Sequence, residues 1–184
     1  MANVQMIGNA GVGHSGAVGE PAALEAFPHW QYFLSIESDF EKSLAFVELT
    51  QENFNTFSTE YVRILLSACS EVDVVMKQIC LSLQPTARLR NIDDYREIIK
   101  SEFPHFARMK VFVPRYGRTL EPWIDWEQNA NPKWWRAHTN VKHERNLFYS
   151  SANLDATLNS VAGLFCTVLY FNRQVKWSSI PGHP

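Results

Sequence analysis

A long apolar stripe at helical spacing runs through residues 55–83 of this sequence. Its members recur every three or four positions and share one face over about seven turns. They are Phe57, Tyr61, Ile64, Leu65, Ala68, Val72, Val75, Ile79 and Leu83. Ser58 or Thr59 suits the N-cap, and Pro85 ends the helix because proline cannot continue it. Such a helix must bury its face against other helices, which predicts an α-helical bundle.

Four further segments are predicted to be helices. Residues 36–48 and 153–172 carry apolar stripes, and residues 92–101 place acids in the first turn, as the helix dipole favours. Pro132 suits the first turn of a helix over 132–146. The fold class is therefore all-α, with four or five helices.

Three local features refine this fold. Residues 109–121 alternate and then turn at Gly117, which predicts a small β-hairpin insertion, and residues 122–131 look like a loop. Gly163 lies inside the last predicted helix, where glycine costs about 1 kcal/mol relative to alanine. We therefore expect a close helix contact at that glycine.

The chain divides into one domain and two tails. We expect a flexible, glycine-rich tail over residues 1–28, a helical domain over 29–174 and a C-terminal tail over 175–184. Residues 11–16 fit GxGxxG and residues 8–15 approach a Walker A loop. Both motifs need a preceding strand and a following helix, and the surrounding sequence predicts neither.

Composition favours a folded cytoplasmic protein. Hydrophobic residues make up 46% and aromatic residues 13%, which is more than a disordered chain carries. The start has no signal-peptide core, and no apolar run approaches the roughly 18–20 residues that span a bilayer, so we expect no membrane partner. Cys69, Cys80 and Cys166 lie in apolar stretches, which predicts buried thiols in a reducing compartment.

Charge is unevenly distributed along the chain. Residues 1–62 hold one basic residue and eight acids, whereas residues 88–184 hold fourteen basic residues and nine acids. A basic C-terminal half can attract a polyanion although the whole chain has a net charge of −2. The alternative is that these charges only solvate the surface.

The helix predicted over 132–146 carries the strongest candidate site. Arg136, Asn140 and His143 are spaced i, i+4 and i+7, so they fall within a sector of about 60° on one face. Further positive charge lies nearby on this helix, at Lys133, Lys142 and Arg145. These three cations are candidate RNA-binding residues.

This residue set suits phosphodiester chemistry without a metal or other cofactor. Arg136 can bind phosphate oxygens with two donors, and His143 can exchange a proton near neutral pH. RNA supplies its own nucleophile, the ribose 2′-hydroxyl. His138 and His143 lie about 140° apart around the helix, so they do not converge on one metal. The alternative is that these side chains only contact water or form a local hydrogen bond.

The long second helix carries a weaker signal. Ser67, Glu71 and Asp73 interrupt its apolar pattern. A carboxylate near a packed face usually has a partner, and Arg136 is a candidate for that role. Equally, these polar residues can simply face water.

Together these two helices resemble HEPN domains. Six residues separate Arg136 from His143, which is similar to the Arg-x(4–6)-His signature of that family. Trp134 and Trp135 precede the signature, and a second-helix string at 65–79, with Ser67 and Glu71, resembles the polar-marked helix that packs against it. The resemblance covers roughly residues 30–172.

The resemblance implies a function and a partner. Catalytic HEPN members are metal-independent endoribonucleases of toxin–antitoxin and phage-defence systems, and they dimerise through the signature helix. By that likeness Arg136 binds the phosphate, His143 is the acid/base, and Asn140 and Glu71 support them. An antitoxin or defence-system protein is a further expected partner. Ala137 stands where many active members carry a polar residue.

Two alternatives to a ribonuclease stay open. Many HEPN domains are non-catalytic dimerisation or ligand-binding modules, and the same helices suit such a role. A metabolic enzyme of another class is the other alternative, although no strong nucleophile–base pair or metal pattern supports it.

Overall fold

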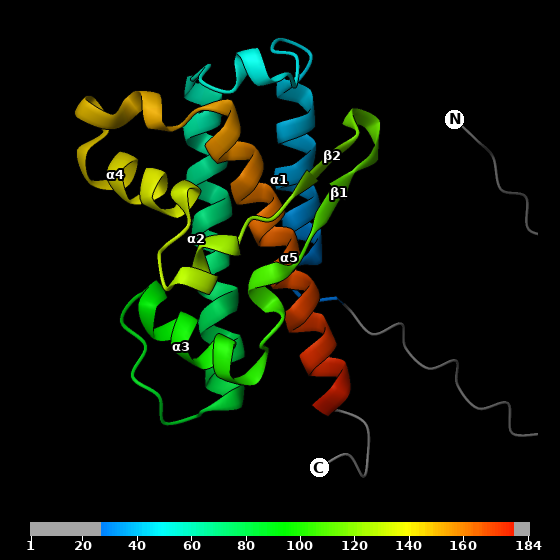
Figure 1. Cartoon of the computed structure of the whole chain (residues 1–184), viewed down its shortest axis with the longest axis vertical. Helices are drawn as coiled ribbons and strands as arrows, with labels where there is room; N and C mark the ends of the chain where they lie inside the picture. Colours follow the sequence, from blue (N-terminus) through cyan, green and yellow to red (C-terminus); the bar gives the residue numbers. More distant parts are fainter. Residues whose placement is uncertain (1–26, 179–184) are drawn as a thin grey trace, which may run out of the picture.

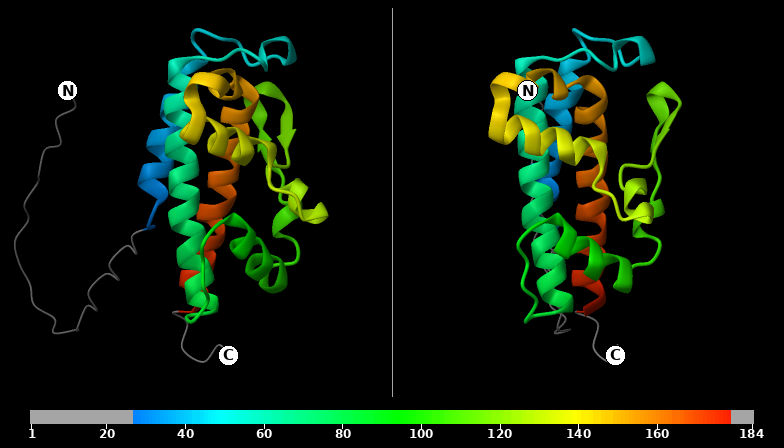
Figure 2. Two further views of the ribbon diagram at one scale, coloured as in Figure 1. Left: turned by 90° about the vertical axis from the view of Figure 1, so that its left-hand side faces the viewer. Right: turned by 60° about the vertical axis from the view of Figure 1, so that its left-hand side comes forward.

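The computed structural model describes residues 27–178, and these residues form five α-helices and one two-stranded antiparallel sheet. Three helices, α1 (Trp30–Ser43), α2 (Thr59–Leu83) and α5 (Leu154–Ser178), lie side by side along the long axis (Figures 1 and 2). α2 and α5 run in the same direction, and α1 runs opposite to them (Figure 1). The predicted helical fold with a small hairpin is confirmed at this level.

The contact between α2 and α5 forms the centre of the core. The stripe predicted on α2 is buried from Tyr61 to Ile79, and the three cysteines are buried beside it as free thiols. The Ser58 side chain accepts a hydrogen bond from the Tyr61 amide and so caps α2. The helix therefore begins at Thr59, later than the expected residue 55, and Phe57 is half-exposed outside it.

The first helix lies earlier in the chain than the expected 36–48. It spans Trp30–Ser43, because Phe33 extends the buried stripe toward the N-terminus. The Ser43 hydroxyl donates to the Phe40 carbonyl at 2.6 Å, and the chain turns there. Val47, which was expected on the helix, packs against the core from that turn.

The last helix corrects two expectations. Leu154–Gln174 is long and apolar enough to cross a membrane, contrary to the sequence expectation, but 67% of its most apolar window is buried inside the structure. It is therefore the central helix of the bundle. α5 also continues to Ser178, beyond the expected end at residue 172 and into the predicted tail. The glycine-rich segment and its nucleotide-like motifs lie outside the described residues.

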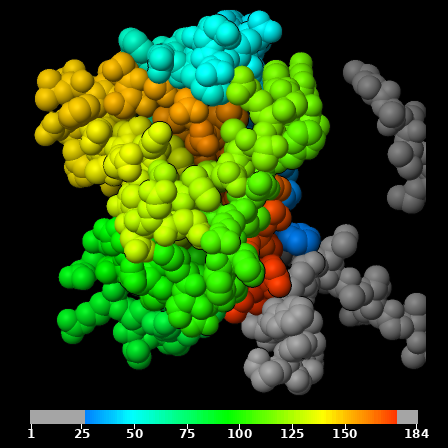
Figure 3. Space-filling model, in the orientation of Figure 1, coloured from blue at the N-terminus to red at the C-terminus, as the bar shows by residue number. Residues whose placement is uncertain are grey.

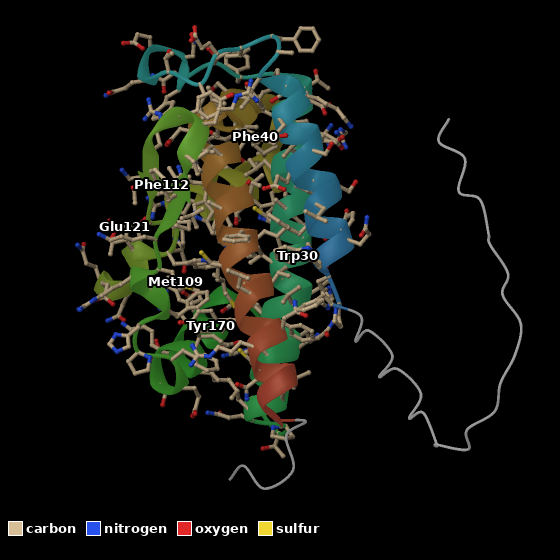
Figure 4. The ribbon with its side chains drawn as sticks, turned by 90° about the vertical axis from the view of Figure 1, so that its right-hand side faces the viewer. Trp30, Phe40, Met109, Phe112, Glu121 and Tyr170 are labelled. Carbon is tan, nitrogen blue, oxygen red and sulfur yellow. The ribbon has the colours of Figure 1, made fainter. Side chains whose placement is uncertain are left out.

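The shorter elements follow the predicted pattern closely. α3 (Ile92–Glu102) is capped by the Asn91 side chain, which accepts two backbone N–H bonds. Strands β1 (Val111–Val113) and β2 (Arg118–Leu120) pair in antiparallel register, and the turn between them has Gly117 at φ 59°. The hairpin lies beside α5 and α1 (Figure 4).

The segment 122–131 is more ordered than the expected loop. It contains a 3-10 helix, η4 (Ile124–Gln128), and it buries Trp123 and Trp126 completely. The two indole rings lie 4.4 Å apart, between centroids. Spacing alone missed this element because its aromatic residues do not repeat with a helical or strand period.

Gly163 makes the close contact that its position predicted. A Cβ at this position would lie 2.7 Å from the Trp134 ring, and the Trp123 indole donates to the Gly163 carbonyl at 3.1 Å. The Trp134 indole in turn donates to the Pro122 carbonyl at 2.7 Å. Together these contacts fix α4 (Lys133–Phe148) and the segment before it across the upper part of α5 (Figure 2).

Candidate functional site

α4 buries one face and exposes the face that carries the candidate residues. Trp134, His138 and Val141 are buried against α2 and α5. The candidate residues on the opposite side are exposed, namely Lys133, Arg136, Asn140 and His143. The yellow atoms of α4 in Figure 3 accordingly form part of the molecular surface, next to the orange start of α5.

The regular part of α4 ends directly after His143. Glu144 has φ −137° and ψ 54°, which breaks the helix, although the chain returns to helical geometry up to Phe148. The expected single helix over 132–146 is therefore two pieces joined by a kink. Pro132 occupies the N-cap position and not the first turn.

A polar cleft of about 550 Å³ lies between α4, η4 and the start of α5. Its polar lining comprises Glu121, Asp125, Lys133, Arg136, Asn140, Ser151, Asn153, Asp155 and Asn159. Arg136, Asn140 and Lys133 thus come together with carboxylates from two other elements. The local sequence had no signal for these carboxylates, because packing of the tryptophans brings their segments to α4.

His143 lies in a different hollow from Arg136. This second hollow, about 540 Å³, is open and is lined only by residues 142–147. The His143 imidazole has no hydrogen bond or ion pair within the described part of the chain. Helical spacing therefore placed both residues on the exposed side, but it did not show that they open into separate hollows.

The cations of α4 are unpaired. Lys133, Arg136, Lys142 and Arg145 are all exposed, and none has a carboxylate within 4.0 Å among the described residues. Elsewhere, by contrast, Arg63 and several other cations form ion pairs. These four side chains, called here the positive surface of α4, thus have no carboxylate in direct contact, although Lys133 and Arg136 share the polar cleft with Asp125 and Asp155.

The predicted partnership between Arg136 and Glu71 is not formed. Arg136 donates to the backbone carbonyl of Asn131, at the entrance to its own helix. Glu71 instead lies 2.5 Å from the Nδ1 atom of His29, a residue with φ 65° directly before α1. Sequence reasoning missed His29 because 42 positions separate it from Glu71.

The other two polar residues of α2 also lie away from Arg136. Asp73 accepts a hydrogen bond from the Tyr95 hydroxyl at 3.1 Å, which joins α2 to α3. Ser67 is half-buried on α2 and lines neither hollow. A direct supporting role for either residue at Arg136 therefore has no geometric basis within one copy.

His138 is the buried histidine of α4. Burial, and to a smaller degree the positive charge of Lys142, lower its pKa to about 4 even though Asp73 acts in the opposite direction. Its Nδ1 atom has no hydrogen-bond partner in the described structure. His138 is therefore neutral near pH 7, whereas His143 on the same helix faces solvent.

Asp155 is the most desolvated carboxylate of the polar cleft. Burial raises its pKa, and the nearby Lys133 and a hydrogen bond from the Asn159 amide counteract that effect. The amide nitrogen donates to one carboxylate oxygen at 3.0 Å. The second oxygen of Asp155 accepts no hydrogen bond from the described residues.

Within the described residues, no group of three or more His, Cys, Asp or Glu side chains is arranged to hold a metal ion. No protein-family model, curated protein or solved structure matches this chain. The case for function therefore depends on the residues themselves.

Proposed function

We propose that this protein is a metal-independent endoribonuclease of the HEPN type. Arg136 binds the scissile phosphate and stabilises its developing charge. His143 accepts the proton of the ribose 2′-hydroxyl as that oxygen attacks the phosphorus, and it then donates the proton to the 5′-oxygen that leaves. Asn140 orients the phosphate from the same face. The products are then a 2′,3′-cyclic phosphate and a free 5′-hydroxyl.

The unpaired positive surface of α4 is the observation that carries this proposal. Four exposed cations without carboxylate partners lie on the same helix as an exposed histidine. Phosphate contacts supply most of the affinity of proteins for nucleic acids, and arginine matches phosphate geometry with two donors. Such a surface suits RNA better than it suits a neutral ligand.

A second copy of the chain completes the site in this proposal. Arg136 and His143 are seven residues apart, which is about 10 Å along a helix, and they open into separate hollows. When two α4 helices face each other in opposite directions, Arg136 of one copy approaches His143 of the other. Leu147, which is 75% exposed beside His143, supplies an apolar contact for that interface.

The biological setting proposed here comes from the family resemblance alone. It is a cytoplasmic toxin–antitoxin or phage-defence system, in which a partner protein controls the nuclease. An antitoxin that covers α4 would neutralise the positive surface and block dimerisation at once.

The test is cleavage of a mixed-sequence RNA in EDTA. We expect the wild-type protein to cut the RNA, and we expect His143→Ala and Arg136→Ala each to lose at least about 100-fold in rate. His105→Ala is the matched control, because His105 is exposed outside both hollows. Full activity in both α4 variants, with unchanged circular dichroism, would remove the proposed roles.

A non-catalytic HEPN-like dimerisation module is the second candidate. Two observations favour it: Arg136 already donates to the Asn131 carbonyl, and His143 has no group that orients its ring. In that case the wild-type protein is inert toward RNA, while its mass in solution is that of a dimer. Substitution of Leu147 by glutamate then lowers the mass in solution to that of a monomer.

A further inference from the structure

The polar cleft beside Arg136 has two chemically different walls. α4 contributes the cations Lys133 and Arg136, and η4 and α5 contribute the carboxylates Asp125 and Asp155. The volume of about 550 Å³ is in the range of small-molecule sites. A ligand that fits must therefore combine a negative group with hydrogen-bond donors.

The negative group of the ligand must lie against α4. The start of α5 also faces the cleft, but its amides are already used: Leu154 and Asp155 donate to backbone carbonyls, and Ala156 donates to the Asn153 side chain. This helix start has no free N–H group for an anion. Lys133 and Arg136 are thus the groups that can hold a phosphate in the cleft.

The opposite wall offers acceptors. The Asp125 side chain is half-buried and has no hydrogen bond or ion pair within the described residues. Asp155 has one oxygen free, and Asn159 uses its amide nitrogen on Asp155, which leaves its carbonyl oxygen for a ligand. An ionised carboxylate only accepts, so this wall selects a ligand edge that is rich in donors.

Among the four RNA bases, guanine presents such an edge. Its N1–H and N2–H groups are adjacent donors in one plane and match the two oxygens of one carboxylate. On the same edge, adenine, cytosine and uracil have no two adjacent donor groups, so one carboxylate oxygen would meet an acceptor. The mismatch repels them from this wall.

We propose that the polar cleft binds the nucleotide next to the scissile phosphate and selects guanine, with its phosphate on Lys133 and Arg136 and its base on Asp125. The link to the scissile phosphate rests on the proposed function, whereas the selection of guanine rests on the cleft alone. The proposal therefore predicts a ribonuclease that cleaves RNA preferentially beside guanine.

The probes for this proposal are the four nucleoside 5′-monophosphates, titrated separately by calorimetry. We expect GMP to bind at least about tenfold more tightly than AMP, CMP or UMP, since one good bidentate contact discriminates by that much or more. Asp125→Asn replaces one acceptor by a donor and should remove that preference. Glu102→Gln is the matched control, because Glu102 is an exposed carboxylate outside the cleft.

The outcomes separate this inference from the proposed function. Equal binding of the four nucleotides, no binding, or an unchanged GMP preference in Asp125→Asn would overturn guanine selection. RNA cleavage without base preference would overturn it too, while leaving the nuclease intact. A GMP preference that Asp125→Asn abolishes, in a protein that cuts no RNA, would support the cleft assignment and overturn the nuclease.

Discussion

At the scale of the residue, Gly163 shows how one position fixes the placement of the site. Glycine inside a helix is unfavourable on propensity alone, yet here it admits the Trp134 ring. That ring is itself held by its hydrogen bond to Pro122, so it cannot easily move away. The need for a close contact was predictable from the sequence, but its partner was not, because 29 positions separate the two residues.

Gly163→Ala should therefore destabilise the protein despite the better helix propensity of alanine. The gain of about 1 kcal/mol in propensity is outweighed by an overpacking cost of about 1–3 kcal/mol, since the new methyl group would lie 2.7 Å from the ring. We expect a lower midpoint in urea unfolding. Ser38→Ala, at an exposed helical position, serves as the control and should not lower it. An increase in stability for Gly163→Ala would show that the contact is loose.

His138 gives a pH-dependent prediction. Its pKa is about 4 when folded and about 6.5 when exposed in the unfolded chain. As pH falls through this window, the unfolded chain takes up a proton that the folded protein does not, so stability decreases. The loss amounts to at most about 3 kcal/mol, and above pH 6.5 it is absent.

His138→Phe should flatten the stability profile between pH 6.5 and 4. The measurement is the free energy of unfolding in urea at several pH values. His105→Gln removes an exposed histidine and should leave the dependence of the unfolding free energy on pH unchanged. An identical slope in wild type and His138→Phe would contradict the assignment of the acid sensitivity to this buried ring.

At the scale of the element, α4 shows what helical spacing in a sequence can predict and what it cannot. The pattern predicted which side chains share the exposed face, and the structure exposes all three members of the candidate face. It did not predict the break at Glu144, because glutamate is a good helix former and nothing local marks a kink. It also could not show the cleft, whose other walls come from η4 and α5.

Salt dependence tests the positive surface of α4. If Lys133, Arg136, Lys142 and Arg145 each contact phosphate, RNA affinity should fall roughly 50-fold between 50 and 200 mM salt. Removal of Lys142 and Arg145 together, as alanine, should halve the slope of log affinity against log salt. Binding is measured in the His143→Ala background, so that the RNA stays intact.

The matched control removes two cations elsewhere. Lys77→Ala with Arg88→Ala deletes the same charge from exposed positions off α4. An equal reduction in slope for both double variants would mean that RNA responds to net charge only, and that α4 is not its binding surface.

At the scale of the whole molecule, α4 is an outer element that packs against the central helices α2 and α5. α2 and α5 form the core, and the tryptophan cluster fixes α4 and η4 against α5 (Figures 1 and 2). Periodicity predicted that helical architecture, because apolar stripes determine which faces are buried. It could not predict the long-range pairs, such as His29 with Glu71, that decide where polar residues of α2 point.

The most direct measurement of the central claim uses two RNA oligonucleotides that differ in one oxygen. One contains a single cleavage site found with the wild-type protein, and the other carries a 2′-deoxyribose at that site. In EDTA, we predict that the wild-type protein cuts the first to a 2′,3′-cyclic phosphate and leaves the second intact, and that His143→Ala cuts neither. Failure to find any RNA cleavage site with the wild-type protein, cleavage of the deoxy-substituted RNA, or cleavage of the first RNA by His143→Ala would contradict the account.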